Sequence, residues 1–69
     1  MNKKQKKQRN IVCAIKNSVL EHEDQGDKNL GDYTVWTSWI MYIAQCNYSE
    51  LRDAMNVYRK ETGKELSFA

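Results

Sequence analysis

The chain has 69 residues, of which 41% are hydrophobic and 29% are charged, and its formal net charge is +2. This length supports one domain, residues 1–69, whose small core normally needs help from disulfides, a metal, self-association or very good helix packing. Two cysteines, one histidine and no CxxC pair argue against a disulfide framework and against a zinc site. We therefore expect no metal and no cofactor, and look to helix packing or a homo-oligomer for the missing stability.

The charges are unevenly distributed along the chain. Residues 1–16 hold six basic residues and no acid, whereas residues 17–69 hold five basic and nine acidic residues, a net charge of −4. Such a body repels phosphate, so any contact with nucleic acid should depend on the basic N-terminal arm, residues 1–9. The arm's candidate phosphate-binding residues are Lys3, Lys4, Lys6, Lys7 and Arg9.

The distribution of proline, glycine and apolar residues predicts an all-α fold. Proline is absent, strand-like alternation is rare, and the three glycines fall between helical patterns. We expect a small three-helix bundle or an orthogonal three-helix domain. The predicted elements are the basic arm or frayed helix start 1–9, helices 10–23, 33–46 and 48–62, and a tail 64–69.

The first helix is predicted from one apolar face at helical spacing, made by Ile11, Val12, Ile15, Val19 and Leu20. Residues before Arg9 have nothing apolar to bury, which allows them to fray. A polar connection follows, under which Leu30 can tuck, and Leu66 and Phe68 give the C-terminal tail a means of folding back.

The next two helices carry recognisable end signals. Asp32 or Thr34 can cap the second helix, because each offers a side-chain oxygen to free backbone N–H groups. Asn47 followed three residues later by Glu50 is a capping-box pattern for the third helix. Gly63 suits the position after that helix ends.

The segment from Tyr33 to Ser49 is uncharged over seventeen residues and holds both tryptophans. Its stripe of Trp36, Trp39, Ile40 and Ile43 is predicted to face the core, and Val35, Met41 and Tyr42 lie outside that stripe. Because apolar residues cover more than half of this helix, its flank is either hidden by a neighbour or left as an interface. The candidate partner-binding residues are Trp39, Tyr42, Tyr48, Met55 and Tyr58.

Other interpretations of the same residues are weaker. Seventeen uncharged residues reach only the lower limit of a membrane-spanning helix, and the five-residue apolar run 11–15 is too short for a signal peptide. Free thiols at Cys13 and Cys46, expected to act as small core residues, then favour a cytoplasmic protein. A helix-turn-helix fits poorly, since the pattern after Ala44 is one residue short.

Catalysis lacks a cluster of suitable groups: His22 lies between two glutamates, and nothing in the sequence lowers a cysteine pKa. The sequence therefore predicts a non-enzymatic interaction protein that binds a macromolecule, most simply a protein, as an inhibitor or adaptor. Its size and basic start are typical of small accessory proteins of phages or mobile elements. The alternative is a nucleic-acid-binding regulator that uses the basic arm.

Overall fold

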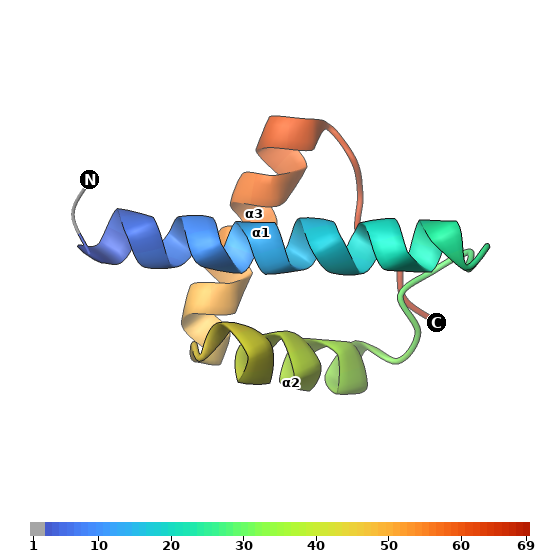
Figure 1. Cartoon of the computed structure of the whole chain (residues 1–69), viewed down its shortest axis with the longest axis horizontal. Helices are drawn as coiled ribbons and strands as arrows, with labels where there is room; N and C mark the ends of the chain where they lie inside the picture. The colour runs from blue at the N-terminus through green and yellow to red at the C-terminus, as the bar shows by residue number, and fades with distance from the viewer. Residues whose placement is uncertain (1–2) are drawn as a thin grey trace.

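A computed structural model describes residues 3–69, which form three helices and no strand: α1 Lys3–Asp24, α2 Tyr33–Ala44 and α3 Tyr48–Thr62. The first two residues of the basic arm lie outside this range. In Figure 1, α2 runs back along α1 in the opposite direction, and α3 starts beside the end of α2 and crosses behind α1. The prediction of a small all-α three-helix bundle is confirmed.

The predicted helix ends are formed by side chains near them in sequence. Asp32 accepts a hydrogen bond from the Val35 N–H at the start of α2. Asn47 and Glu50 form the reciprocal capping box of α3, and Gly63 ends that helix in the left-handed region at φ 69°. These bonds satisfy backbone groups that would otherwise lack partners at the helix ends.

The second helix ends two residues earlier than predicted. Gln45 adopts a left-handed conformation (φ 53°), and the chain leaves the helix there. The Cys46 N–H donates to the Met41 carbonyl oxygen and closes the turn. A non-glycine residue at such a position gives no sequence signal, which is why the predicted helix ran on to residue 46.

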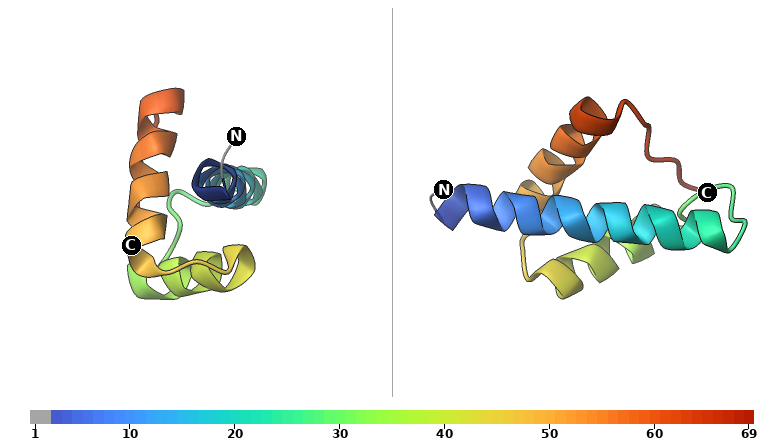
Figure 2. Two further views of the ribbon diagram at one scale, coloured as in Figure 1. Left: turned by 90° about the vertical axis from the view of Figure 1, so that its left-hand side faces the viewer. Right: turned by 45° about the horizontal axis from the view of Figure 1, so that its top comes forward.

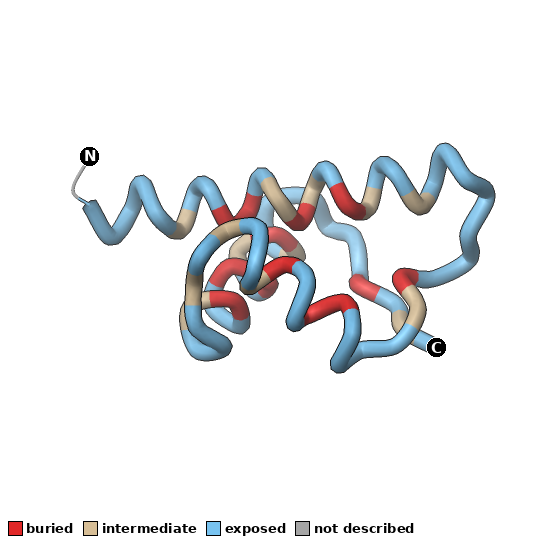
Figure 3. The backbone as a smooth tube through the Cα atoms, turned by 60° about the horizontal axis from the view of Figure 1, so that its bottom comes forward, coloured by how far each residue is buried: buried red, intermediate tan, exposed pale blue. Residues whose placement is uncertain are grey.

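The core fills the angle between the helices. Seen along α1, α2 and α3 form two sides of an angle that α1 occupies (Figure 2), and the buried backbone positions face this interior (Figure 3). Its buried apolar residues are Ile11, Val12, Ile15, Leu30, Trp36, Ile40, Leu51, Ala54, Met55, Tyr58 and Leu66. The Cα radius of gyration, 11.6 Å, is near the value of about 11 Å typical of a folded chain of this length.

The C-terminal tail folds back, as predicted, and is hydrogen-bonded to the connection between α1 and α2. The Leu30 N–H donates to the Ser67 carbonyl oxygen, and the Ala69 N–H donates to that of Gly31. Phe68 packs edge-on against the rings of Tyr33 and Trp36. The tail thereby covers the N-terminal end of the buried side of α2.

Residues 3–9 of the basic arm form the first turns of α1, so within this range the arm is a helix start. Lys7 pairs with Glu50 at 3.0 Å, and Arg9 makes a two-pronged pair with Glu61 at 2.8 and 2.9 Å. The Asn47 N–H, together with Lys7, holds the pKa of the Glu50 carboxyl below its usual value, and Arg9 does the same for Glu61. Contacts with α3 thus hold this part of the helix.

Candidate interaction surface

One side of α2 is fixed in the core. Trp36 is 4% exposed, and its indole Nε1–H donates to the Ser18 hydroxyl of α1 at 2.8 Å. Ile40 lies one turn further along and is fully buried. Thr37 is also buried. Its hydroxyl donates to the Thr34 carbonyl oxygen within the helix, which satisfies the buried polar group. These contacts set the rotation of α2 about its own axis.

The opposite side of α2, which we call the outer face, is apolar and open to solvent. It consists of Val35, Trp39, Tyr42 and Ile43, flanked by Thr34 and Ser38. Trp39 is 56% exposed and Tyr42 is 77% exposed, and their rings stack with centroids 6.0 Å apart. No charged side chain belongs to α2, so the outer face carries no charge of its own.

The prediction that Trp39 and Ile43 belong to the core stripe was wrong. Successive residues of a helix lie about 100° apart around its axis, so a small rotation of the helix changes which residues lie at the middle of its buried side. Here the middle of the buried side lies on the Thr37 side of Trp36, which turns Trp39 outward. Val35 and Tyr42 lie away from the core, as expected, whereas Met41 packs partly against it.

Two of the five predicted anchors lie inside the molecule. Met55 and Tyr58 are 3% and 2% exposed, because they share the buried face of α3 with Leu51 and Ala54. They cannot touch a partner while the bundle is folded. Of the proposed anchors, Trp39 and Tyr42 lie together on the outer face of α2.

The third exposed anchor, Tyr48, lies at the start of α3. Its hydroxyl forms a hydrogen bond with the Tyr33 hydroxyl, and this bond raises the pKa of Tyr33. Tyr48 is therefore exposed but already engaged through its polar end. This hydrogen bond joins the start of α3 to the start of α2.

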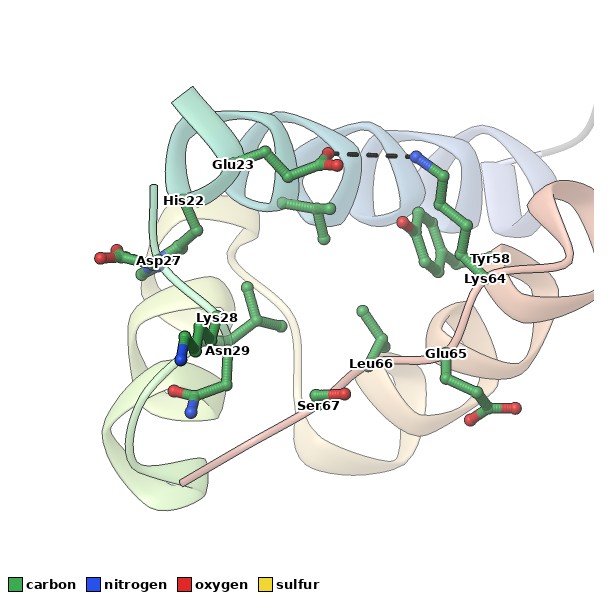
Figure 4. Close-up of a pocket in the computed structure, with 12 residues that line it drawn as sticks. His22, Glu23, Asp27, Lys28, Asn29, Tyr58, Lys64, Glu65, Leu66 and Ser67 are labelled. Atoms are coloured by element: carbon green, nitrogen blue, oxygen red, sulfur yellow. Dashed lines mark hydrogen bonds and ion pairs between the residues drawn. The ribbon is translucent and has the colours of Figure 1, made fainter. Parts of the chain in front are cut away.

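A separate hollow of about 290 Å³ lies beside the connection between α1 and α2 (Figure 4). Apolar side chains contribute to its lining, and His22 Nδ1 lies 2.8 Å from Asp27 Oδ2 at its edge. Lys64 Nζ and Glu23 Oε1 face each other across it at 3.9 Å. Among residues 3–69, no serine, threonine or cysteine side chain bonds to His22, so the pair lacks the geometry of a nucleophile–base–carboxylate triad.

Both cysteines are free thiols. Cys13 is exposed, contrary to the expectation of a core position, and Cys46 is partly buried, which raises its pKa. In the described part of the chain, no three His, Cys, Asp or Glu side chains gather as metal ligands would. None of the helices within residues 3–69 combines the length and apolar character needed to cross a membrane.

The outer face of α2 can form apolar and aromatic contacts. The indole N–H of Trp39 and the phenol O–H of Tyr42 are the polar groups that can orient a partner. No protein family, curated protein or solved structure compared with this chain matches it. Function has therefore to be inferred from the residues of this surface and from the charges of α1.

Proposed function

We propose that this chain is a small non-enzymatic interaction protein that binds a protein partner through the outer face of α2 and acts as an inhibitor or adaptor. The observation that carries the proposal is the stacked, exposed pair of Trp39 and Tyr42. Tryptophan and tyrosine are enriched among the residues that dominate binding energy, because each offers a large apolar area with little conformational freedom to lose.

The support for α2 suits it to rigid recognition. Trp36 and Ile40 hold one side of the helix in the core, so the outer face presents its rings without first having to fold. Val35, Trp39 and Tyr42 follow one another at spacings of four and three residues, as helical anchors do in an apolar groove. The partner would offer such a groove, and its occupation by α2 would block or bridge other contacts of that partner.

The test is affinity capture from a lysate of the organism that encodes the chain, with wild type, Trp39→Ala and Tyr42→Ala compared. Loss of an anchor worth about 2 kcal/mol lowers affinity roughly 30-fold, so both variants should fail to retain the captured protein. Lys60→Ala, on the exposed side of α3, is the matched control and should retain it. Far-UV circular dichroism should show unchanged helicity. Equal recovery by all four chains would refute the proposal.

A nucleic-acid-binding regulator is the second candidate, and it is supported by the first turn of α1. Lys3, Lys4 and Lys6 make no ion pair with any residue of the described range 3–69, unlike Lys7 and Arg9. Cations at a helix N-terminus oppose the helix dipole, so helix stability does not explain them. A role in phosphate binding would explain these three lysines.

Three such lysines limit the salt dependence of this second activity. Neutralising three phosphates gives a slope of about −3 when the logarithm of affinity for duplex DNA is plotted against that of salt. Replacing all three with glutamine should remove retention on a DNA column and leave the pairs of Lys7 and Arg9 intact. Retention that survives the triple substitution would rule out the arm as the contact.

A further inference from the structure

Because it carries no charge, the outer face of α2 is the surface best suited to contact a second copy of the chain. A contact between identical chains about a two-fold axis joins the same patch of both copies, so a patch that carries charge of one sign repels itself. The chain has 11 basic and 9 acidic residues, and none falls between Tyr33 and Ser49. The exposed surfaces of α1 and α3, by contrast, carry charges along their length.

The spacing on this face is also self-complementary. Val35, Trp39 and Tyr42 repeat at four and three residues, the spacing of a helix–helix seam. If a two-fold axis passes between residues 39 and 42, Trp39 of each copy faces Tyr42 of the other. The small Ser38 then faces the larger Ile43, and the two stacked pairs join into a cluster of four rings.

The helix dipole favours the antiparallel arrangement. The Asp32 carboxylate caps the N-terminal end of α2, whereas no basic residue occupies its last turn, so the C-terminal end has no compensating charge within the helix. In an antiparallel pair, the N-terminal end of each helix lies beside the C-terminal end of the other. A parallel pair would set like ends together.

The area of the face sets the strength of the contact. A covered aromatic side chain buries about 150–250 Å², so the exposed parts of the outer face would remove on the order of 400 Å² per copy. A standard stable interface buries about 800 Å² per partner. The contact is therefore sufficient for reversible association and too small for a permanent dimer.

We propose that two copies of this chain associate through the outer faces of their α2 helices, antiparallel and about a two-fold axis, with a dissociation constant of about 10–100 μM. The dimer covers Trp39 and Tyr42. One consequence, which rests on the proposed function above, is that self-association and partner binding exclude each other. At concentrations above this dissociation constant, the dimer is then the form that holds the aromatic surface out of water until a partner is present.

Sedimentation equilibrium of the full chain from about 1 μM to 1 mM tests the association. Wild type should pass from monomer to dimer across this range. Tyr42→Glu and Tyr42→Lys, changes at a side chain 77% exposed, should each be monomeric, because they place like charges at the axis. An equimolar mixture of the two should associate again, whereas Lys60→Glu should behave as wild type. A wild-type monomer at 1 mM, or a mixture that stays monomeric, overturns the proposal.

Disulfide trapping tests the direction of the helices, in a background where Cys13→Ser and Cys46→Ser remove the native thiols. At 1.5 Å per residue, the two copies of residue 42 are offset by about 4.5 Å along an antiparallel pair, and the two copies of residue 35 by about 16 Å. Tyr42→Cys should therefore form a reducible dimer and Val35→Cys should not. Trapping through both positions would overturn the antiparallel arrangement.

The two proposals on this surface can fail separately. A partner captured through Trp39 by a chain that remains monomeric at 1 mM supports the proposed function and overturns the dimer. A dimer that responds to the charge exchange, with no partner captured, supports the dimer alone. If both hold, adding the captured partner should dissociate the dimer in proportion to its concentration.

Discussion

Two tryptophans three residues apart on α2 have opposite surroundings. Trp36 is 4% exposed and donates its indole N–H to Ser18, whereas Trp39 is 56% exposed and stacks on Tyr42. The same residue type thus holds the bundle together on one side of the helix and remains open on the other. The rotation of α2, rather than its apolar content, therefore determines which rings a partner can reach.

Removing each tryptophan in turn should change the stability of the fold by very different amounts. Trp36→Ala should lower the free energy of unfolding by about 3–5 kcal/mol, because it leaves a large cavity in a small core. Trp39→Ala should lower it by less than about 1 kcal/mol, because its ring is already half in water. Urea denaturation followed by far-UV circular dichroism measures both. Equal losses would mean that the two sides of α2 do not differ in this way.

A smaller effect isolates the hydrogen bond that distinguishes the buried ring. Ser18→Ala removes the acceptor of the Trp36 N–H and leaves a buried donor unpaired, which should cost about 1–3 kcal/mol. Ser38→Ala, at an exposed position beside the outer face, should change stability by less than about 0.5 kcal/mol. Denaturation curves of the two variants give the comparison. If Ser18→Ala behaves like Ser38→Ala, the indole bond does not stabilise the fold.

Local signals in the sequence were sufficient for much of this fold. Asp32 and the pair of Asn47 and Glu50 cap their helices as predicted, because capping depends on residues within one turn. The tail also folded back as its apolar residues indicated. The sequence could not supply the rotation of α2, because a threonine is normally expected at the surface and the burial of Thr37 depends on a hydrogen bond that its hydroxyl makes within the helix.

The candidate site was predictable only in part, for reasons of distance along the chain. Trp39 and Tyr42 were identified from their type, but the apolar stripe of α3 could not reveal that Met55 and Tyr58 are covered by the other helices. Nor could it show that Arg9 meets Glu61, 52 residues away. That pair depends on how α1 crosses α3, which no local pattern encodes.

A substitution at the end of α2 tests the backbone of the helix without changing its buried or its outer face. Gln45 occupies a left-handed conformation that costs a non-glycine residue about 1 kcal/mol. Gln45→Gly should raise the free energy of unfolding by about 0.5–1 kcal/mol, part of the gain being lost to the freer unfolded chain. Thermal unfolding followed by circular dichroism measures it. A loss of stability would show that the Gln45 side chain contributes more than its backbone costs.

A change of pH should affect the ion pairs between α1 and α3, by a small amount, and leave the uncharged outer face of α2 unaffected. The folded pKa of Glu61 lies below its usual value because Arg9 binds its carboxylate, so the pair stabilises the fold above about pH 4.5. That contribution should be lost as pH falls through the folded pKa, which lowers the midpoint of thermal unfolding as the pH falls below about 4.5. Both carboxylates in such pairs with α1, Glu50 and Glu61, are accessible to solvent, so the shift should be modest and should shrink in salt.

Glu61→Gln should flatten this acid dependence, and the outer face of α2 should be indifferent to it. That face has no carboxylate and no histidine, so the dimerisation constant measured by sedimentation should stay unchanged from about pH 5 to 8. The thermal midpoint of Glu61→Gln, measured beside wild type over the acid range, completes the test. An association that weakens in parallel with the loss of the Arg9 pair would place the contact on α1 and α3 rather than on the outer face of α2.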